Sequence, residues 1–248
     1  RRLEAELERG RLFLAELIGA QHRGWAREGE RWYSAALGTL EAVARQARES
    51  AWHRLELEAL TELAWAHYWA YREAKRQEER EKALQEARKA IERARSRLIE
   101  VPHGPYIHYS TISIALLRAR IALDLFRQWV EDRAHQERQH EERPLGDPKA
   151  IRRRIRERIG EEIRQDPHGL KEAIEAILEG LREARELGAC IPPRVAFLDV
   201  LYEYFKRFNQ HELEGLRHWL EQQPDSDEKE ELLRFLEESI GLQRHVSP

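Results

Sequence analysis

The chain has 248 residues, of which 36% are charged and 41% are hydrophobic, and its formal net charge at pH 7 is only -3. This length is sufficient to bury a substantial core. Because acidic and basic residues are interleaved, no overall field favours a nucleic acid or an anionic membrane as partner. No apolar run approaches the roughly 20 residues of a membrane span, and the first residues lack a signal-peptide core. We therefore expect a soluble, cytoplasmic protein.

Cys190 is the only cysteine, which excludes a disulfide framework and a cysteine-based zinc cluster. Methionine is absent and charged residues are dense, a composition typical of thermophiles. A chain that begins with Arg and contains no Met also leaves open that it is a fragment of a longer protein.

Apolar residues recur at helical spacing along most of the chain, and no segment shows the alternation of a strand. The first half predicts helices over residues 2–22, 27–49, 52–75 and 79–98. The second half predicts helices over residues 107–142, 148–164, 170–187, 193–208, 211–222 and 228–240. The sequence around Asp225 and Glu228 resembles a capping box. The predicted fold is all-α, with nine or ten helices.

The segment VPHGP, which follows the fourth predicted helix, is the clearest break. It separates N-terminal helical hairpins (1–100) from a C-terminal helical part (107–248), with the break at 101–106. We expect the two parts to form one continuous structural unit. The end of the helix predicted over 107–142 is polar on all sides, so it must project into solvent or lie at an interface.

A pattern of small and apolar residues recurs in three predicted helices. Its members are Ala36, Leu40 and Ala47, then Ala83, Ala87 and Ala94, then Ala173, Ile177 and Ala184. Small residues at this spacing let a neighbouring helix approach closely, as stacked hairpins require. The alternative is that alanine-rich amphipathic helices match one another by chance.

The chain resembles the tetratricopeptide-like (TPR-like) superhelix, well over residues 27–98 and poorly over 107–187. Leu63 and Ala64, with Tyr68 and Tyr71, approximate the first helix of that repeat, and the small residues from Ala83 onward match the second. The period is longer than in the family, and no proline reliably closes each unit. Long-helix variants look like the sensor superhelices of bacterial signal-transduction ATPases. The resemblance implies stacked antiparallel hairpins that sense a ligand or a partner.

Trp65, Tyr68, Trp69 and Tyr71 form the densest aromatic cluster. One interpretation is core packing between helices; the other is an aromatic groove for a peptide or small ligand. Four large aromatic residues within seven positions cannot all face one core, so we expect one or two to be accessible. His103 and Tyr106, at the Pro-Gly break, are further candidates for ligand contacts, with a capping or surface role as the alternative.

The segment 152–158 contains the only basic run, and Arg152, Arg153 and Arg156 are candidates for phosphate contacts with a nucleic acid. The arginines alternate with isoleucines and precede several glutamates, which is typical of a solvated helix face.

His135 and His140 lie five residues apart, about 140° around a helix, so they cannot readily chelate one ion. We therefore predict no metal and no cofactor. Known catalytic and nucleotide-binding motifs do not occur, so we expect that the protein is not an enzyme. The expected function is a protein- or peptide-interaction scaffold, or the sensor domain of a larger bacterial regulator. The alternative is a helical nucleic-acid-binding subunit of a larger complex.

Overall fold

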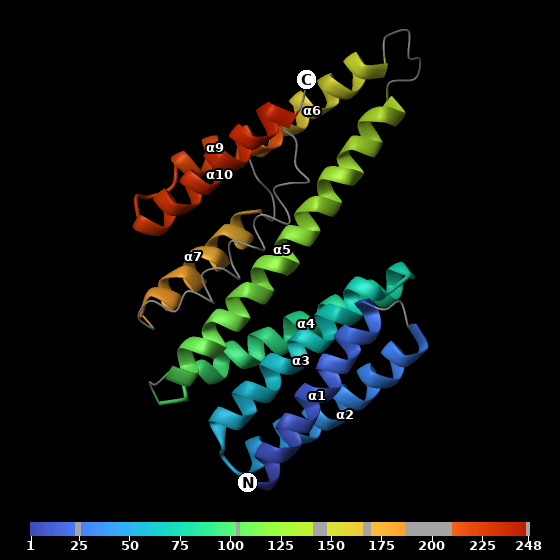
Figure 1. Ribbon diagram of the computed structural model, residues 1–248, viewed down its shortest axis with the longest axis vertical. Coiled ribbons are helices and arrows are strands. Elements are labelled where there is room, and N and C mark those ends of the chain that lie inside the picture. Colours follow the sequence, from blue (N-terminus) through green and yellow to red (C-terminus); the bar gives the residue numbers. More distant parts are fainter. Residues whose placement is uncertain (23–25, 103–104, 141–147, 166–169, 187–209, 247–248) are drawn as a thin grey trace. The chain divides into compact units, whose positions relative to one another are not determined.

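The computed structural model describes residues 1–248 except 23–25, 103–104, 141–147, 166–169, 187–209 and 247–248. Within these described residues the chain forms nine α-helices and no strand (Figure 1). The predicted all-α class is therefore confirmed. The helix predicted over 193–208 lies outside the described residues. Among the helices that are described, none carries a long enough apolar stretch to cross a membrane.

The chain divides into two compact units, Arg1–Leu117 and Arg118–Pro248, and each is described by itself. The predicted break at 101–106 precedes the helix in which this division falls, and the continuity predicted for the two parts stays a prediction.

The first unit is built from four helices that follow one another closely and from the start of a fifth. These are α1 (Arg2–His22), α2 (Ala26–Glu49), α3 (His53–Glu73), α4 (Gln77–Leu98) and the first part of α5 (Pro105–His140). α1 packs against α2, α3 packs against α4, and α3 also contacts both α1 and α2. The unit is therefore a stack of two helical hairpins, as the repeat pattern predicted.

The small residues of the repeat pattern are buried where helices meet. Ala36 and Ala47 of α2 and Ala87 and Ala94 of α4 are fully buried. Because these side chains are short, they let a neighbouring helix approach closely. This burial confirms that the repeat pattern marks the core-facing side of α2 and of α4.

A fully buried carboxylate joins three helices of the first unit. Glu56 of α3 accepts a hydrogen bond from Nε of Arg48 on α2 at 2.8 Å, and Nε of Arg97 on α4 lies 2.9 Å from its other oxygen. A buried charge is strongly destabilising unless it is paired, so this contact fixes the ends of α2 and α4 on α3.

The second unit contains the rest of α5, then α6 (Pro148–Gln165), α7 (Leu170–Glu186), α9 (Gln210–Glu221) and α10 (Asp227–Val246). α6 packs on α9, and α10 contacts both α9 and α7. The buried face of α6 is a stripe at helical spacing, composed of Ile155, Ile159 and Ile163.

The polar end of α5 lies against α6. Nη2 of Arg133 is 2.6 Å from a carboxylate oxygen of Glu162, and Nη1 of Arg158 donates to Glu137 at 2.8 Å. This polar segment therefore lies at an interface within the chain, between α5 and α6. Our expectation of an additional contact surface for a partner at this segment stays a prediction.

The start of α10 differs from the predicted capping box. The hydroxyl oxygen of Ser226 accepts the backbone N–H of Lys229 at 3.1 Å, which makes Ser226 the N-cap in place of Asp225. Asp225 instead accepts a hydrogen bond from Nζ of Lys229 at 2.9 Å. The same ammonium donates to the backbone carbonyls of Glu221 and Gln223. Lys229 thereby satisfies free carbonyl groups at the end of α9.

α6 and α9 cross with backbone against backbone at two glycines. A Cβ on Gly215 would lie 2.6 Å from the carbonyl oxygen of Gly160, and one on Gly160 would lie 2.8 Å from the carbonyl oxygen of His211. Neither position has room for a methyl group unless the helices separate.

We predict that Gly215→Ala lowers the free energy of unfolding of the second unit by about 1–3 kcal/mol, because the added methyl group overpacks the crossing. Gly241→Ala on α10 is the matched control, since a Cβ there meets nothing within 4 Å. The control should gain about 1 kcal/mol from the better helix propensity of alanine. Urea denaturation followed by circular dichroism measures both, and equal effects of the two substitutions would contradict the close crossing.

Candidate functional site

A groove of about 460 Å³ lies in the first unit and is lined by three alternate helices. α3 contributes Leu55, Glu58, Thr61 and Glu62 along with Arg54, α1 contributes Glu4, Leu7, Glu8 and Arg11, and the first turns of α5 contribute Tyr109, Ser110 and Ser113. The volume is in the range of sites that hold small ligands or the side chains of a bound peptide.

The guanidinium of Arg11 is the charged centre of this groove. Its Nε donates to Glu62 and its Nη2 to Glu58, both at 2.9 Å, while Nη1 donates to Glu8 on its own helix. Arg54 donates to the other oxygen of Glu58 at 2.8 Å. The planar guanidinium thus serves three carboxylates from two helices, a geometry that an ammonium group does not reproduce.

Two pKa values in the groove are shifted. Burial raises the pKa of Glu62 above its ordinary value, and the hydrogen bond and charge of Arg11 offset only part of this effect. Burial acts against the charged form of Arg11, but its bonds to Glu62, Glu8 and Glu58 outweigh burial and raise its pKa. Arg11 is therefore a permanent cation beside a carboxylate that is costly to ionise.

The remaining lining combines apolar surface with hydroxyl groups. Tyr109 has 55% of its surface exposed, so its ring is available to a bound molecule. Ser113 accepts a hydrogen bond from the indole Nε1–H of Trp65 at 2.8 Å. Through this bond the predicted aromatic cluster touches the edge of the groove.

The four predicted aromatic residues have different surroundings. Tyr68 and Tyr71 are buried, with ring centroids 6.2 Å apart, so they are core residues and are not accessible to a partner. Trp65 and Trp69 are partly buried and pack against a core cluster of α1 and α3. Our expectation that one or two of these aromatics are accessible fits the two tryptophans, and their contact with a ligand stays a prediction.

The other predicted site residues are placed only in part. His103 and the side chain of Tyr106 lie outside the described residues, as does the side chain of Arg152. Arg153 and Arg156 are exposed on α6, and Nε of Arg153 lies 3.6 Å from Glu157. This pairing is what a solvated helix face shows.

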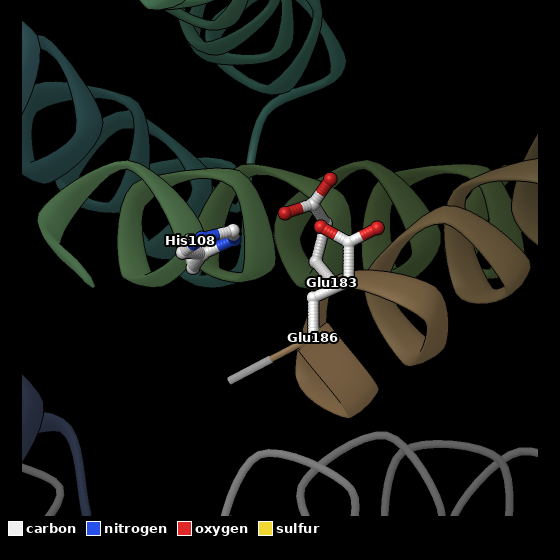
Figure 2. A group of neighbouring side chains, drawn as sticks. All are labelled: His108, Glu183 and Glu186. Atoms are coloured by element: carbon white, nitrogen blue, oxygen red, sulfur yellow. The ribbon is translucent and has the colours of Figure 1, made fainter. Parts of the chain in front are cut away.

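Figure 2 labels Glu183 and Glu186, which are three residues apart on α7, and His108 of α5. The two glutamates belong to the second unit and His108 belongs to the first, so no metal site is assigned to them. The side chain of His140 is outside the described part, and His135 is hydrogen-bonded to Gln139.

Comparison with known proteins gave no match to a family model, a curated protein or a solved structure.

The sequence interpretation missed the charged residues of the groove. One signal was available: Glu58 and Glu62 are four residues apart on α3, and like charges at this spacing destabilise a helix unless a cation lies between them. Nothing in the sequence shows that this cation is Arg11, which lies 47 residues from Glu58.

We predict that Arg11→Lys lowers the free energy of unfolding by about 2 kcal/mol, since one ammonium cannot hold the carboxylates of Glu58 and Glu62 together. Arg9→Lys is the matched control, because Arg9 contacts only the partly exposed Glu6 on the same helix among the ion pairs of the described residues, at 3.7 Å. Urea denaturation measures both variants. Equal stabilities of the two variants would show that Arg11 does not hold α1 on α3.

A second buried polar pair, Tyr33 of α2 and His67 of α3, lies outside the groove. The Tyr33 hydroxyl is 3.0 Å from Nδ1 of His67. Burial, with the charges of Glu41 and Glu86, raises the pKa of Tyr33 to about 12. Burial lowers the pKa of His67, although the charge of Glu86 opposes the shift. The imidazole is therefore held neutral, and its Nδ1 shares a hydrogen bond with the tyrosine hydroxyl.

We predict that this pair makes the first unit sensitive to acid. Below pH 6.5, the ordinary histidine value, the unfolded chain takes up the proton at this position before the folded chain does. Stability is consequently lost as the pH falls from 6.5 towards the lowered pKa of His67. His67→Phe should lose the hydrogen bond at every pH but flatten this dependence. Urea denaturation across that range tests it, and His135→Phe, at an exposed position, is the control that should keep the wild-type slope.

Proposed function

We propose that this chain is a non-catalytic interaction module that binds a peptide segment of a partner protein in the groove of α1, α3 and α5. It would act as a scaffold or as the sensor part of a larger regulatory protein. The observation that carries the proposal is the groove itself, about 460 Å³ in volume and lined by apolar, hydroxyl and charged side chains. Apolar surface with a few placed polar groups is typical of ligand sites.

The arrangement of the helices supports the same proposal. In a stack of hairpins, the first helices of successive hairpins lie side by side and line one face. Here the groove is lined by α1, α3 and α5, and α1 contacts α3. This arrangement is compatible with the TPR-like resemblance, which implies hairpins that sense a ligand or a partner.

The nucleic-acid alternative has weaker support. Arg158 is engaged by Glu137 at 2.8 Å, and Arg153 faces Glu157. Arginines that are neutralised by neighbouring carboxylates release few counterions when they meet a phosphate backbone.

Panning a displayed library of random linear peptides of about ten residues against the full chain tests the proposal. We expect enriched peptides whose affinity falls about tenfold with Tyr109→Ala, because this exposed ring lines the groove. Ile99→Ala is the matched control: Ile99 is 88% exposed but does not line the groove.

The proposal is overturned if no peptide is enriched, or if enriched peptides respond equally to the two substitutions. Nucleic-acid binding that falls steeply with salt and is abolished by Arg153→Glu with Arg156→Glu would favour the alternative instead.

A further inference from the structure

The charges that line the groove do not balance. Four carboxylates line it, those of Glu4, Glu8, Glu58 and Glu62, against the two guanidinium groups of Arg11 and Arg54. Four negative charges less two positive ones leave a net charge of -2 in a partly enclosed space. The whole chain, by contrast, has a net charge of only -3 over 248 residues, so the groove concentrates negative charge.

One of these carboxylates, Glu62, is incompletely paired. Glu58 uses both oxygens, one for Arg11 and one for Arg54. Among the described contacts, Glu62 accepts only at Oε1, from Nε of Arg11. A carboxylate has about four lone-pair positions on its two oxygens, so Glu62 retains the capacity to accept a further donor from the groove.

The same groove has one exposed aromatic side chain next to its carboxylates. Leu7 and Leu55 line the groove but are buried, whereas the ring of Tyr109 is exposed at the start of α5. An aromatic face attracts a cation, and its apolar surface accommodates the methylene stem of a long cationic side chain.

We propose that the groove recognises an arginine or lysine side chain of a linear peptide segment, with the cationic head at Glu62 and the methylene stem along the exposed ring of Tyr109. This inference rests on the proposed peptide-binding function and specifies its ligand.

An organic cation fits this groove better than other charged ligands. An anion would meet a net charge of -2 and four carboxylates. A divalent metal ion needs several oxygen ligands at once, but both oxygens of Glu58 and one oxygen of Glu62 already accept hydrogen bonds from Arg11 and Arg54. A guanidinium or ammonium group on a long stem can share Glu62 with Arg11 through the unused oxygen.

Two displayed libraries separate the possible outcomes. One encodes random linear peptides of about ten residues with all amino acids, and the other is identical but lacks Arg and Lys codons. Both are panned against the full chain, and groove binding is defined by loss of affinity with Tyr109→Ala. We expect groove-dependent peptides from the first library only, each with at least one Arg or Lys.

The outcomes distinguish this inference from the proposed function. Groove-dependent peptides from the library without Arg and Lys, with comparable affinity, overturn the cation inference and leave peptide binding intact. Failure of both libraries to yield a groove-dependent peptide overturns both.

Substitution at Glu62 gives an independent test with a selected peptide. Glu62→Gln keeps the shape and one acceptor but removes the charge, so the affinity should fall about tenfold. Glu92→Gln on α4 is the control: Glu92 lies outside the groove and is exposed, and the net charge of the chain changes by the same amount. Equal losses in the two variants would attribute the effect to general electrostatics and overturn the assignment of Glu62.

The pH dependence of peptide affinity gives a further test, because a purely structural role of Glu62 would not change it. The charged groups that face Glu62 are Arg11, Glu58 and Glu8, and α5 contributes only the neutral Tyr109, Ser110 and Ser113. A cation binds the ionised carboxylate, so affinity should strengthen as the pH rises from 4.5, the ordinary glutamate value, through the raised pKa of Glu62. This rise should be absent in Glu62→Gln, and its persistence there would place the cation elsewhere.

Discussion

The contact on which the candidate groove depends is the bond between Arg11 and the two carboxylates Glu58 and Glu62. α1 contacts α3 less extensively than it contacts its hairpin partner α2, although Leu14 and Leu17 of α1 share a core cluster with α3. The guanidinium adds a directional constraint on the angle between α1 and α3, because its donors have a fixed planar geometry and each carboxylate lies 2.9 Å away. A change in that angle would alter the wall of the groove directly.

Buried charged residues also join helices within each unit. Glu56 holds Arg48 and Arg97 at the junction of α2, α3 and α4, and the buried Lys229 satisfies the carbonyls at the end of α9. Each group is buried and would cost free energy if its partners were removed. These contacts specify where helices end and meet, while the small residues of the repeat pattern allow the helices to approach.

Much of the fold followed from periodicity. The bounds of α1, α2 and α6 and the buried small residues of α2 and α4 could be predicted, because one apolar face at helical spacing leaves little choice of secondary structure. The N-cap of α10 was predicted at Asp225 but is Ser226. Aspartate and serine both suit that position, and the two residues are adjacent in the sequence, so the pattern could not decide between them. Arg11 could not be assigned to the groove, because its partners lie on another helix and one charged residue in a chain with 36% charged residues carries no signal. The aromatic cluster was conspicuous in the sequence because four large aromatic residues fall within seven positions, yet its two tyrosines are buried in the core.

The groove reconciles two demands that normally compete. A carboxylate committed to an ion pair stabilises the fold and is then lost to recognition, whereas an unpaired one in a partly buried site is costly. Under the proposed function Glu62 would meet both demands, because one oxygen accepts Arg11 and the second retains its lone pairs. A cation that binds the second oxygen gives Glu62 another partner without breaking its bond to Arg11 of α1. Since such a ligand would bind only the folded chain, its binding free energy would add to the stability of the first unit. Recognition and the attachment of α1 to α3 would then reinforce each other through one side chain.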